Sequence, residues 1–190
     1  DAALAVQRLS TTAHWSLPVT LPSGPLTLLI SQATPPVFDG AEDQNGKRNH
    51  DENALWLHHI EGRLGTPPAG PFVLAFGANL DPADGAGRRE VMQALLAHPK
   101  LRDPRPKSKG AAAATTPDHL GDPALDTADW AEPTADTFGP GNMRVDFLLP
   151  SADVTVTDAG VFWPALPSSD HALALAASRH RLVWTDIRLP

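Results

Sequence analysis

The sequence predicts an α/β domain with a mixed sheet, and three observations favour this class. Two near-continuous apolar runs, Leu26–Gln32 and Pro71–Gly77, are typical of buried central strands. A helical pattern follows each run along the chain. The last third of the chain carries strand signals in hairpin-like pairs. Strands that alternate with helices and then pair as hairpins predict helices layered on a mixed sheet.

Local signals place the elements of the first half. Short strands are expected at Leu4–Ser10 and His14–Pro22, joined by a turn. The first buried strand leads into a loop rich in Pro, Gly, Asp and Asn. A helix is then expected at Asn49–Gly62, where Asn49 is placed to cap the first turn and Glu52 completes a capping box.

The second half is less regular. Arg88–His98 is expected to be a short helix that Pro99 ends. Residues 99–141 show little periodicity and are expected to be a long loop insertion, which in a compact domain is either functional or disordered. Strands are expected at Arg144–Pro150, Val154–Phe162 and His180–Leu189, with an irregular or helical link near Ala165–Ala177.

The composition excludes several classes of protein. The chain has 190 residues, of which 42% are apolar and 19% charged, as expected for one globular domain or a large part of one. The lack of cysteine excludes a disulfide framework, a thiol nucleophile and a thiolate metal site. The net charge of −7 weighs against the basic face of a typical nucleic-acid binder. No apolar run reaches the roughly 18 residues that a membrane span needs.

Polar residues at the ends of expected strands are the candidate site residues. Asn79 lies directly after the second buried strand, at the sheet edge where α/β proteins bind ligands. Turn chemistry alone also accounts for Asn79 and Asp81. Strand alternation places Arg144 and Asp146 on one face, and an aspartate buried there needs a purpose or a partner. An exposed ion pair at a sheet edge is the alternative.

Four segments, in this order, resemble active-site segments of the endonuclease/exonuclease/phosphatase superfamily. They are SQATPPVFDG at 31–40, FGANLDP at 76–82, RVDFLLP at 144–150 and SRHRLVW at 178–184. The resemblance implies a DNase I-like fold, which is a four-layer α/β/β/α sandwich with mixed, largely antiparallel sheets. It also implies hydrolysis of phosphodiester or phosphomonoester bonds, with Mg²⁺ or Mn²⁺ as cofactor. The substrate is then a phosphoester, with nucleic acid among the classes implied.

The resemblance assigns roles to individual positions. Asn79 would contact a phosphoryl oxygen, and Asp146 would orient the catalytic histidine. Gln32 and Arg144 would bind substrate. Gln32 stands where the family usually has a histidine, and Gly77 stands where the family has an aspartate that helps to position the metal-activated water. Glutamine can donate a hydrogen bond, but it carries no positive charge and moves no proton.

The family's Ser-Asp-His motif has two candidate positions in this chain. His180 has the right context, because it leads straight into the last expected strand, but Arg179 then replaces the family's aspartate. Asp170 and His171 keep both residues of the motif and lie at a plausible distance from Asp146 along the chain. We favour His180 and retain Asp170 and His171 as the alternative. No residue is a certain metal ligand, and Asp170 is the one candidate.

The resemblance covers nearly all of residues 1–190 but only the carboxy-terminal half of the family's domain. The amino-terminal half, which in the family supplies an Asn and a metal-binding Glu, is absent and is therefore an expected partner. Leu28, Ile30, Val73 and Ala75 are expected on a sheet face that this half would cover. Residues 34–52 resemble a bacterial subgroup. The chain begins without Met or a signal region, so export is compatible with the sequence but not implied by it.

The departures from the family pattern leave three functions open. Loss of one positioned acid–base or charge-stabilising group costs about 10²–10⁴ in rate. With Gln32 and Gly77 both substituted, an impaired metal-dependent phosphoesterase is the first expectation. A catalytically inactive pseudoenzyme that acts as a binding module is the second. A structural domain with chance motif matches is the third, and it requires the four segments to lie far apart in the fold.

Overall fold

A four-stranded sheet in the order β1-β2-β3-β6 forms the centre of the computed structural model, which describes residues 2, 5–130 and 139–190. β1 (His14–Leu21) pairs antiparallel with β2 (Gly24–Gln32), and β2 pairs parallel with β3 (Phe72–Gly77). β3 pairs antiparallel with β6 (Asp146–Pro150). The predicted α/β class with mixed, largely antiparallel sheets is confirmed.

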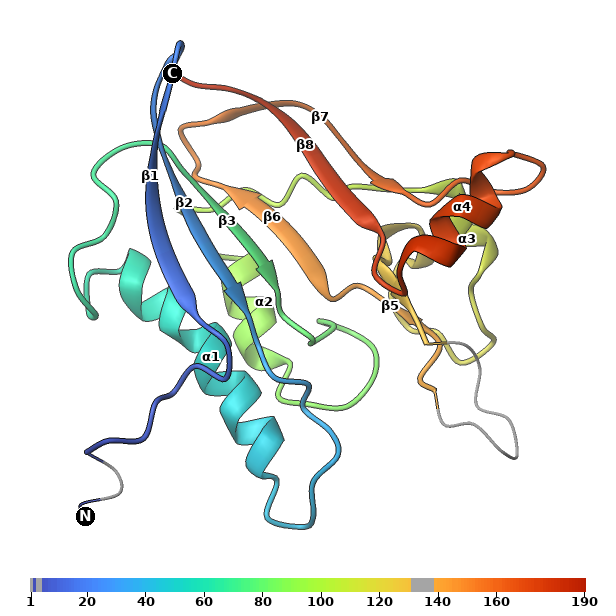
Figure 1. The fold of residues 1–190 in the computed structure, drawn as a ribbon, viewed down its shortest axis with the longest axis horizontal. Coiled ribbons are helices and arrows are strands. Elements are labelled where there is room, and N and C mark those ends of the chain that lie inside the picture. Colours follow the sequence, from blue (N-terminus) through green and yellow to red (C-terminus); the bar gives the residue numbers. More distant parts are fainter. Residues whose placement is uncertain (1, 3–4, 131–138) are drawn as a thin grey trace.

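Two helices, α1 (Gln44–Ile60) and α2 (Glu90–Leu96), cover one face of this sheet (Figure 1). The strand side chains that face them form the main core, because alternation along each strand sends every second residue to this side. Phe76 and Phe147 are partners across β3 and β6, and their rings stack 5.5 Å apart. The same cluster includes Leu29, Trp56, Ile60, Leu74, Met92, Leu95 and Leu149.

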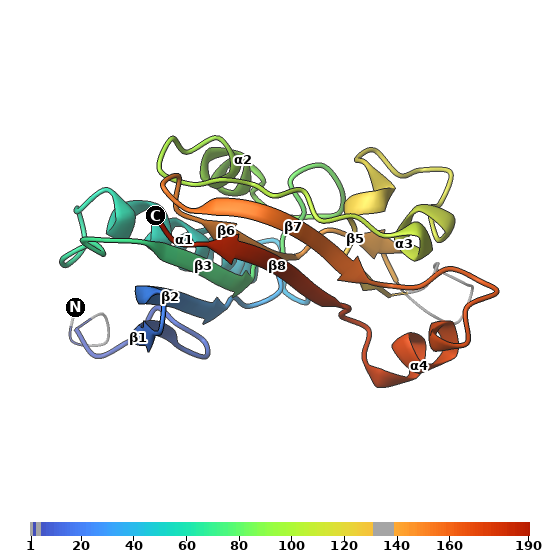
Figure 2. The same cartoon turned by 90° about the horizontal axis from the view of Figure 1, so that it is seen from above.

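An antiparallel hairpin of β7 (Thr155–Phe162) and β8 (Leu182–Arg188) lies beside β6 in both views, with α4 (Asp170–Ala177) at one end of it (Figure 2). Of the four residues expected on an uncovered sheet face, Val73 is buried, whereas Leu28, Ile30 and Ala75 are half-buried. None of the helices in the described part of the chain has the length and apolar character needed for a membrane span.

The expected long loop at 99–141 contains ordered elements. They are α3 (Lys109–Ala113), the 3₁₀ helix η1 (Pro123–Leu125) and β4 (Ala128–Asp129), which pairs with β5 (Asn142–Met143). Residues 131–138 of this expected loop lie outside the described residues. The expected strand at Leu4–Ser10 is wrong for residues 5–10, which form turns and irregular backbone, and Leu4 is not described. The apolar residues there form a short and weakly alternating pattern, and such a pattern does not indicate which strand would pair with the segment.

The prediction that Asn49 caps α1 is wrong, because the helix begins earlier, after Asp43. Asn49 lies inside the helix and is fully buried. Its Nδ2 donates to the Thr34 oxygen at 2.7 Å and to the Ala78 oxygen at 2.8 Å. Asn53 also donates to Ala78, at 3.2 Å. These amides therefore satisfy backbone carbonyls of the two loops that follow β2 and β3, which would otherwise be unpaired in the interior.

Glu52 has a similar role about one turn after Asn49 in the same helix. It is 1% exposed, and its carboxylate accepts hydrogen bonds from the backbone N–H of Thr11 at 2.5 Å and of Thr34 at 2.6 Å. A buried carboxylate is tolerated only with such partners. The helix therefore holds the segment before β1 and the loop after β2 in fixed positions.

We expect Glu52→Ala to lower the free energy of unfolding by about 2–4 kcal/mol, because two backbone N–H donors lose a buried carboxylate acceptor. Asp51→Ala is the matched control: Asp51 is the exposed neighbour on the same helix, and its loss should cost less than about 0.5 kcal/mol. Urea denaturation measures both. Equal effects of the two variants would contradict the positioning role of Glu52.

Candidate active site

Gln32, Gly77 and Asp146 form a row across three adjacent strands. Gln32 is the register partner of Gly77 in the parallel β2–β3 pair. Gly77 is in turn the partner of Asp146 in the antiparallel β3–β6 pair. Asn79 follows Gly77 directly beyond the strand end. Residues that are far apart in the sequence thus lie at one end of the sheet, where the β2 and β3 strands finish.

The Gln32 side chain occupies the space above Gly77. A Cβ atom built on Gly77 would lie 2.0 Å from Gln32 Oε1, which is far inside van der Waals contact. Gln32 is exposed, so the atom in the way is the free end of a flexible side chain. Gln32 and Gly77 are therefore sterically linked, because the glutamine side chain occupies the space that the missing Cβ atom of glycine leaves.

Asn79 ties together the two loops that end β2 and β3. Its backbone is left-handed, with φ of 47°, a conformation in which Asn is enriched among non-glycine residues. Its Nδ2 donates to the Ala33 oxygen at 2.8 Å. Asp81 is the turn former of the same segment, because its carboxylate accepts from the N–H groups of Ala83 at 2.7 Å and Asp84 at 2.8 Å. Turn chemistry thus explains one carboxylate oxygen of Asp81, and the other accepts from the Arg144 N–H at 2.6 Å.

Asp146 lies at the centre of a hydrogen-bond network. His180 Nδ1 is 2.8 Å from Asp146 Oδ2. The hydroxyl of Thr127 donates to the same carboxylate oxygen at 3.0 Å, and it accepts from the Asp146 N–H at 3.0 Å. Thr127 is fully buried, and its carbonyl accepts from the Arg181 N–H at 2.7 Å. One threonine therefore fixes both Asp146 and the chain beside His180.

The electrostatics of the pair favour a charged histidine. The hydrogen bond to Asp146 raises the pKa of His180 above its ordinary value, against the smaller opposing effect of burial. The indole of Trp130 meets the imidazole edge-on, with ring centroids 5.5 Å apart. Gly77, Asp146 and His180 line a cavity of about 270 Å³. His180 is thus positioned to donate a hydrogen bond or a proton to a group in that cavity.

Asp170 and His171 lie elsewhere. They begin α4, where His171 Nδ1 is 2.7 Å from the Pro164 oxygen and the Asp170 N–H donates to Ser168 Oγ at 3.3 Å. The hydrogen bond to Asp146 belongs to His180. Arg179 is exposed, and its carbonyl accepts from the Asp129 N–H at 3.1 Å.

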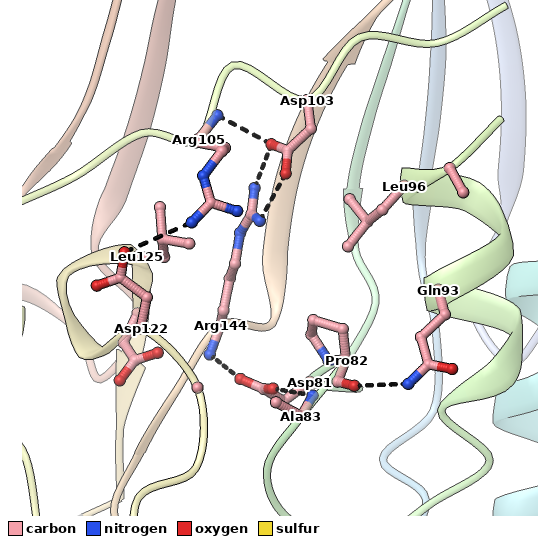
Figure 3. Close-up of a pocket in the computed structure, with 13 residues that line it drawn as sticks. Asp81, Pro82, Ala83, Gln93, Leu96, Asp103, Arg105, Asp122, Leu125 and Arg144 are labelled. Atoms are coloured by element: carbon pink, nitrogen blue, oxygen red, sulfur yellow. Dashed lines mark hydrogen bonds and ion pairs between the residues drawn. The ribbon is translucent and has the colours of Figure 1, made fainter. Parts of the chain in front are cut away.

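Arg144 lines a separate cavity of about 580 Å³, together with Asp103, Arg105 and Asp122 (Figure 3). Its guanidinium forms a two-point ion pair with Asp103, with N···O distances of 2.9 and 2.6 Å. It also stacks 4.7 Å above the ring of Phe147, and the residue is 4% exposed. Arg144 precedes β6, so strand alternation does not place it with Asp146. Its charge is paired with that of Asp103 inside the protein.

The same cavity contains a buried acid. Asp126 is 1% exposed and lies 2.8 Å from His119 Nε2. Its Oδ2 also accepts from Asn142 Nδ2 at 2.5 Å. Burial raises the pKa of Asp126 to about 7, which the neighbouring His119 partly opposes. This cluster joins the 99–141 segment to β5, and we assign it a structural role.

The residues present do not form a complete divalent-cation site. Within the ranges that the structure describes, no group of three or more His, Cys, Asp or Glu side chains could hold a metal ion. At the strand-end row, Gln32 and Gly77 contribute no carboxylate, and the Asp146 carboxylate is hydrogen-bonded to Thr127 and His180. Magnesium prefers hard oxygen ligands. Asp170, the one candidate ligand, lies at the start of α4.

Sequence reasoning missed two residues of this site, Thr127 and Trp130. Both belong to the 99–141 segment, where the lack of periodicity gave no structural assignment. A buried threonine that bridges distant segments leaves no local sequence signal, because its partners are set by the tertiary fold.

Comparison with known proteins finds a matching family model and solved structures of similar fold. A family model described as "Endonuclease/Exonuclease/phosphatase family" matches residues 7–171. No curated protein matches the chain. Among solved structures, an endonuclease/exonuclease/phosphatase from Beutenbergia cavernae is similar at TM-score 0.57 and 19% identity, over 92% of this chain and 38% of that chain. A family protein from Leptotrichia buccalis gives TM-score 0.51 and 15% identity, over 92% of this chain and 53% of that one.

These similarities show the fold, and they confirm the predicted DNase I-like class. The chain spans only 38% and 53% of the lengths of the two structures that it matches.

We expect NMR titration to place the pKa of His180 above about 6.5, its ordinary value. The stabilisation from this pair is complete below that pH and is lost as the pH rises through the raised pKa. Asp146→Asn should lower the pKa of His180, because the partial burial of the ring and the nearby charge of Arg181 both oppose the charged form once the carboxylate is gone. Asp170→Asn is the control and should leave the pKa of His180 unchanged. A low pKa of His180 in the unmodified chain would contradict the assigned pair.

Proposed function

Because this chain belongs to the Endonuclease/Exonuclease/phosphatase family, we propose that it is part of a metal-dependent hydrolase of phosphodiester or phosphomonoester bonds. One observation carries the proposal. The Asp146–His180 pair, at 2.8 Å, lies at the strand-end row that continues into Asn79, and the pair lines a cavity large enough to admit a phosphoryl group. An aspartate that holds a partly exposed histidine in its charged form is the arrangement that general acid catalysis needs.

Each residue of the row has a distinct role in this proposal. Asp146 orients the imidazole of His180 and keeps its pKa high. His180 then donates a proton to the leaving oxygen or a hydrogen bond to the phosphoryl group. The Asn79 amide, which already donates one bond to Ala33, has a second N–H for a phosphoryl oxygen. Gln32 supplies a further neutral donor. We place Arg144 outside this machinery.

Residues outside this row would bind the cation. We propose that Mg²⁺ or Mn²⁺ is held mainly by carboxylates of the amino-terminal half of the same domain, for which this chain is the carboxy-terminal part. Exposed apolar side chains support such a covering half: Trp15 is 62% and Leu182 67% exposed. When bound, the ion would neutralise charge on the phosphoryl group and activate water. Assignment to a bacterial subgroup stays a prediction.

A direct test is hydrolysis of a chromogenic phosphodiester by a longer protein that contains this chain and its amino-terminal half. We expect Mg²⁺-dependent turnover that His180→Ala lowers about 10²–10⁴-fold, because a positioned acid is lost. Asn79→Ala should also lower the rate. His171→Ala is the matched control, since His171 contacts the Pro164 carbonyl at the start of α4. Inertness with and without metal, unchanged by these substitutions, would contradict the active-enzyme proposal.

A second candidate function is a binding module without catalysis. The specific observation is that Gln32 and Gly77 are mutually adapted, so that the side chain at 32 fills the place where the family carries a carboxylate at 77. The exposed Arg179 adds a third departure from the family pattern. Such a module would bind a phosphoester and release it unchanged.

The double variant Gln32→His with Gly77→Asp separates the two candidates. Each single substitution should raise the turnover rate less than the double substitution does. The reason is that an aspartate at position 77 collides with Gln32 until that side chain moves. If turnover appears only in the double variant, the natural chain is a degenerate enzyme that binds a phosphoester without cleaving it. If the unmodified protein already turns over substrate, the binding-module function is contradicted. Rates with and without Mg²⁺ provide the measurement.

A further inference from the structure

An apolar pocket of about 180 Å³ lies next to the proposed phosphoryl site. Its walls come from three segments that are distant in the sequence: the loop after β2, the loop after β3, and the residues around β4 and β5. Most of the lining is apolar, with Pro36, Val37, Phe38, Trp130 and Met143 as the main side chains. The site assigned above uses this pocket only at its border, through Asn79 and Trp130.

The wall formed by the loop after β2 is held in place by α1. Asn45 Nδ2 donates to the Val37 oxygen at 2.8 Å, and the Asn45 N–H donates to Asp39 Oδ2 at 2.5 Å. Between these anchors, Phe38 has a left-handed backbone with φ of 68°, and the residue is 83% exposed. A bulky residue with positive φ is uncommon and persists where the surroundings impose it. The fold thus holds the backbone of Phe38 at the edge of the pocket.

Two residues link the pocket to the proposed site. Asn79, which we assign to the phosphoryl group, also lines the pocket. Trp130 lines it too, and its indole meets the His180 ring edge-on at 5.5 Å. A group attached to a phosphate at His180 and Asn79 would therefore extend directly into the pocket.

We propose that this pocket binds an aromatic ring carried by the phosphoester substrate, so that the chain prefers aryl or nucleobase-bearing phosphoesters over alkyl ones. This proposal rests on the proposed function of the adjacent site. The volume fits one ring, since a cavity of about 150 Å³ lined by apolar side chains holds benzene. Trp130 and Phe38 supply the aromatic surfaces against which such a ring packs.

Binding of non-hydrolysable probes tests the pocket apart from catalysis. Phenylphosphonate and methylphosphonate carry the same phosphoryl group and differ in the ring. We expect phenylphosphonate to bind this chain at least about fivefold more tightly, which corresponds to the lower limit for stacking of one ring. The indole N–H resonance of Trp130, assigned by its loss in Trp130→Ala, should shift with phenylphosphonate.

Substitutions at two positions localise the effect. Ala86→Phe fills the pocket from an exposed position and should remove the preference for the ring. Trp130→Ala should reduce the preference, and Trp130→Phe should restore part of it. Trp15→Ala is the matched control, because Trp15 is an exposed tryptophan on β1 and should leave the preference unchanged.

A second pair of probes identifies the source of the ring. Stronger binding of uridine 5′-monophosphate than of ribose 5-phosphate would assign the pocket to a nucleobase, and a preference confined to phenylphosphonate would assign it to a simple aryl group. Equal or undetectable binding within both pairs would overturn the proposal. Failure of hydrolysis with a retained ring preference would count against the proposed function alone.

Discussion

The hydrogen-bonded carboxylate of Asp146 is the interaction on which the candidate site depends. It joins the last strand of the central sheet to His180 at the start of the β8 segment, and the buried hydroxyl of Thr127 holds it from a third segment. Thr127 also binds the chain next to His180 through its carbonyl. Because three distant segments meet at one carboxylate, the position of the imidazole is set by the packing of the whole domain rather than by a local turn.

The sheet register and the first helix complete the arrangement. Gln32, Gly77 and Asp146 are aligned by strand pairing alone. Buried amides of α1 bind the carbonyls of Thr34 and Ala78, so that the loops after β2 and β3 are fixed relative to that row. The polar residues inside α1 are thus part of the support for the site. Their cost of burial is offset by backbone groups that no other partner satisfies.

Sequence patterns predicted the central sheet well, because its buried strands are apolar runs between proline and glycine, and the family match confirms the resemblance found in the motifs. The predicted start of the first helix was wrong. Asn49 and Glu52 have the residue types and spacing of a capping box, but their side chains form hydrogen bonds with distant loops. Strand alternation also failed for Arg144, since β6 begins only at Asp146. The sequence around Thr127 and Trp130 gave no indication that they belong to the site, because their roles depend on contacts with residues that are distant in the sequence.

In the proposed function, an anion binds between Asn79 and His180, at the end of the sheet. A crystal structure of the longer protein with orthovanadate or inorganic phosphate tests this most directly. We expect an anion within hydrogen-bond distance of the Asn79 amide and of Nε2 of His180, with Nδ1 of His180 still bound to Asp146. An anion held instead by Arg105 and Arg144 in the larger cavity, with none near His180, would contradict it.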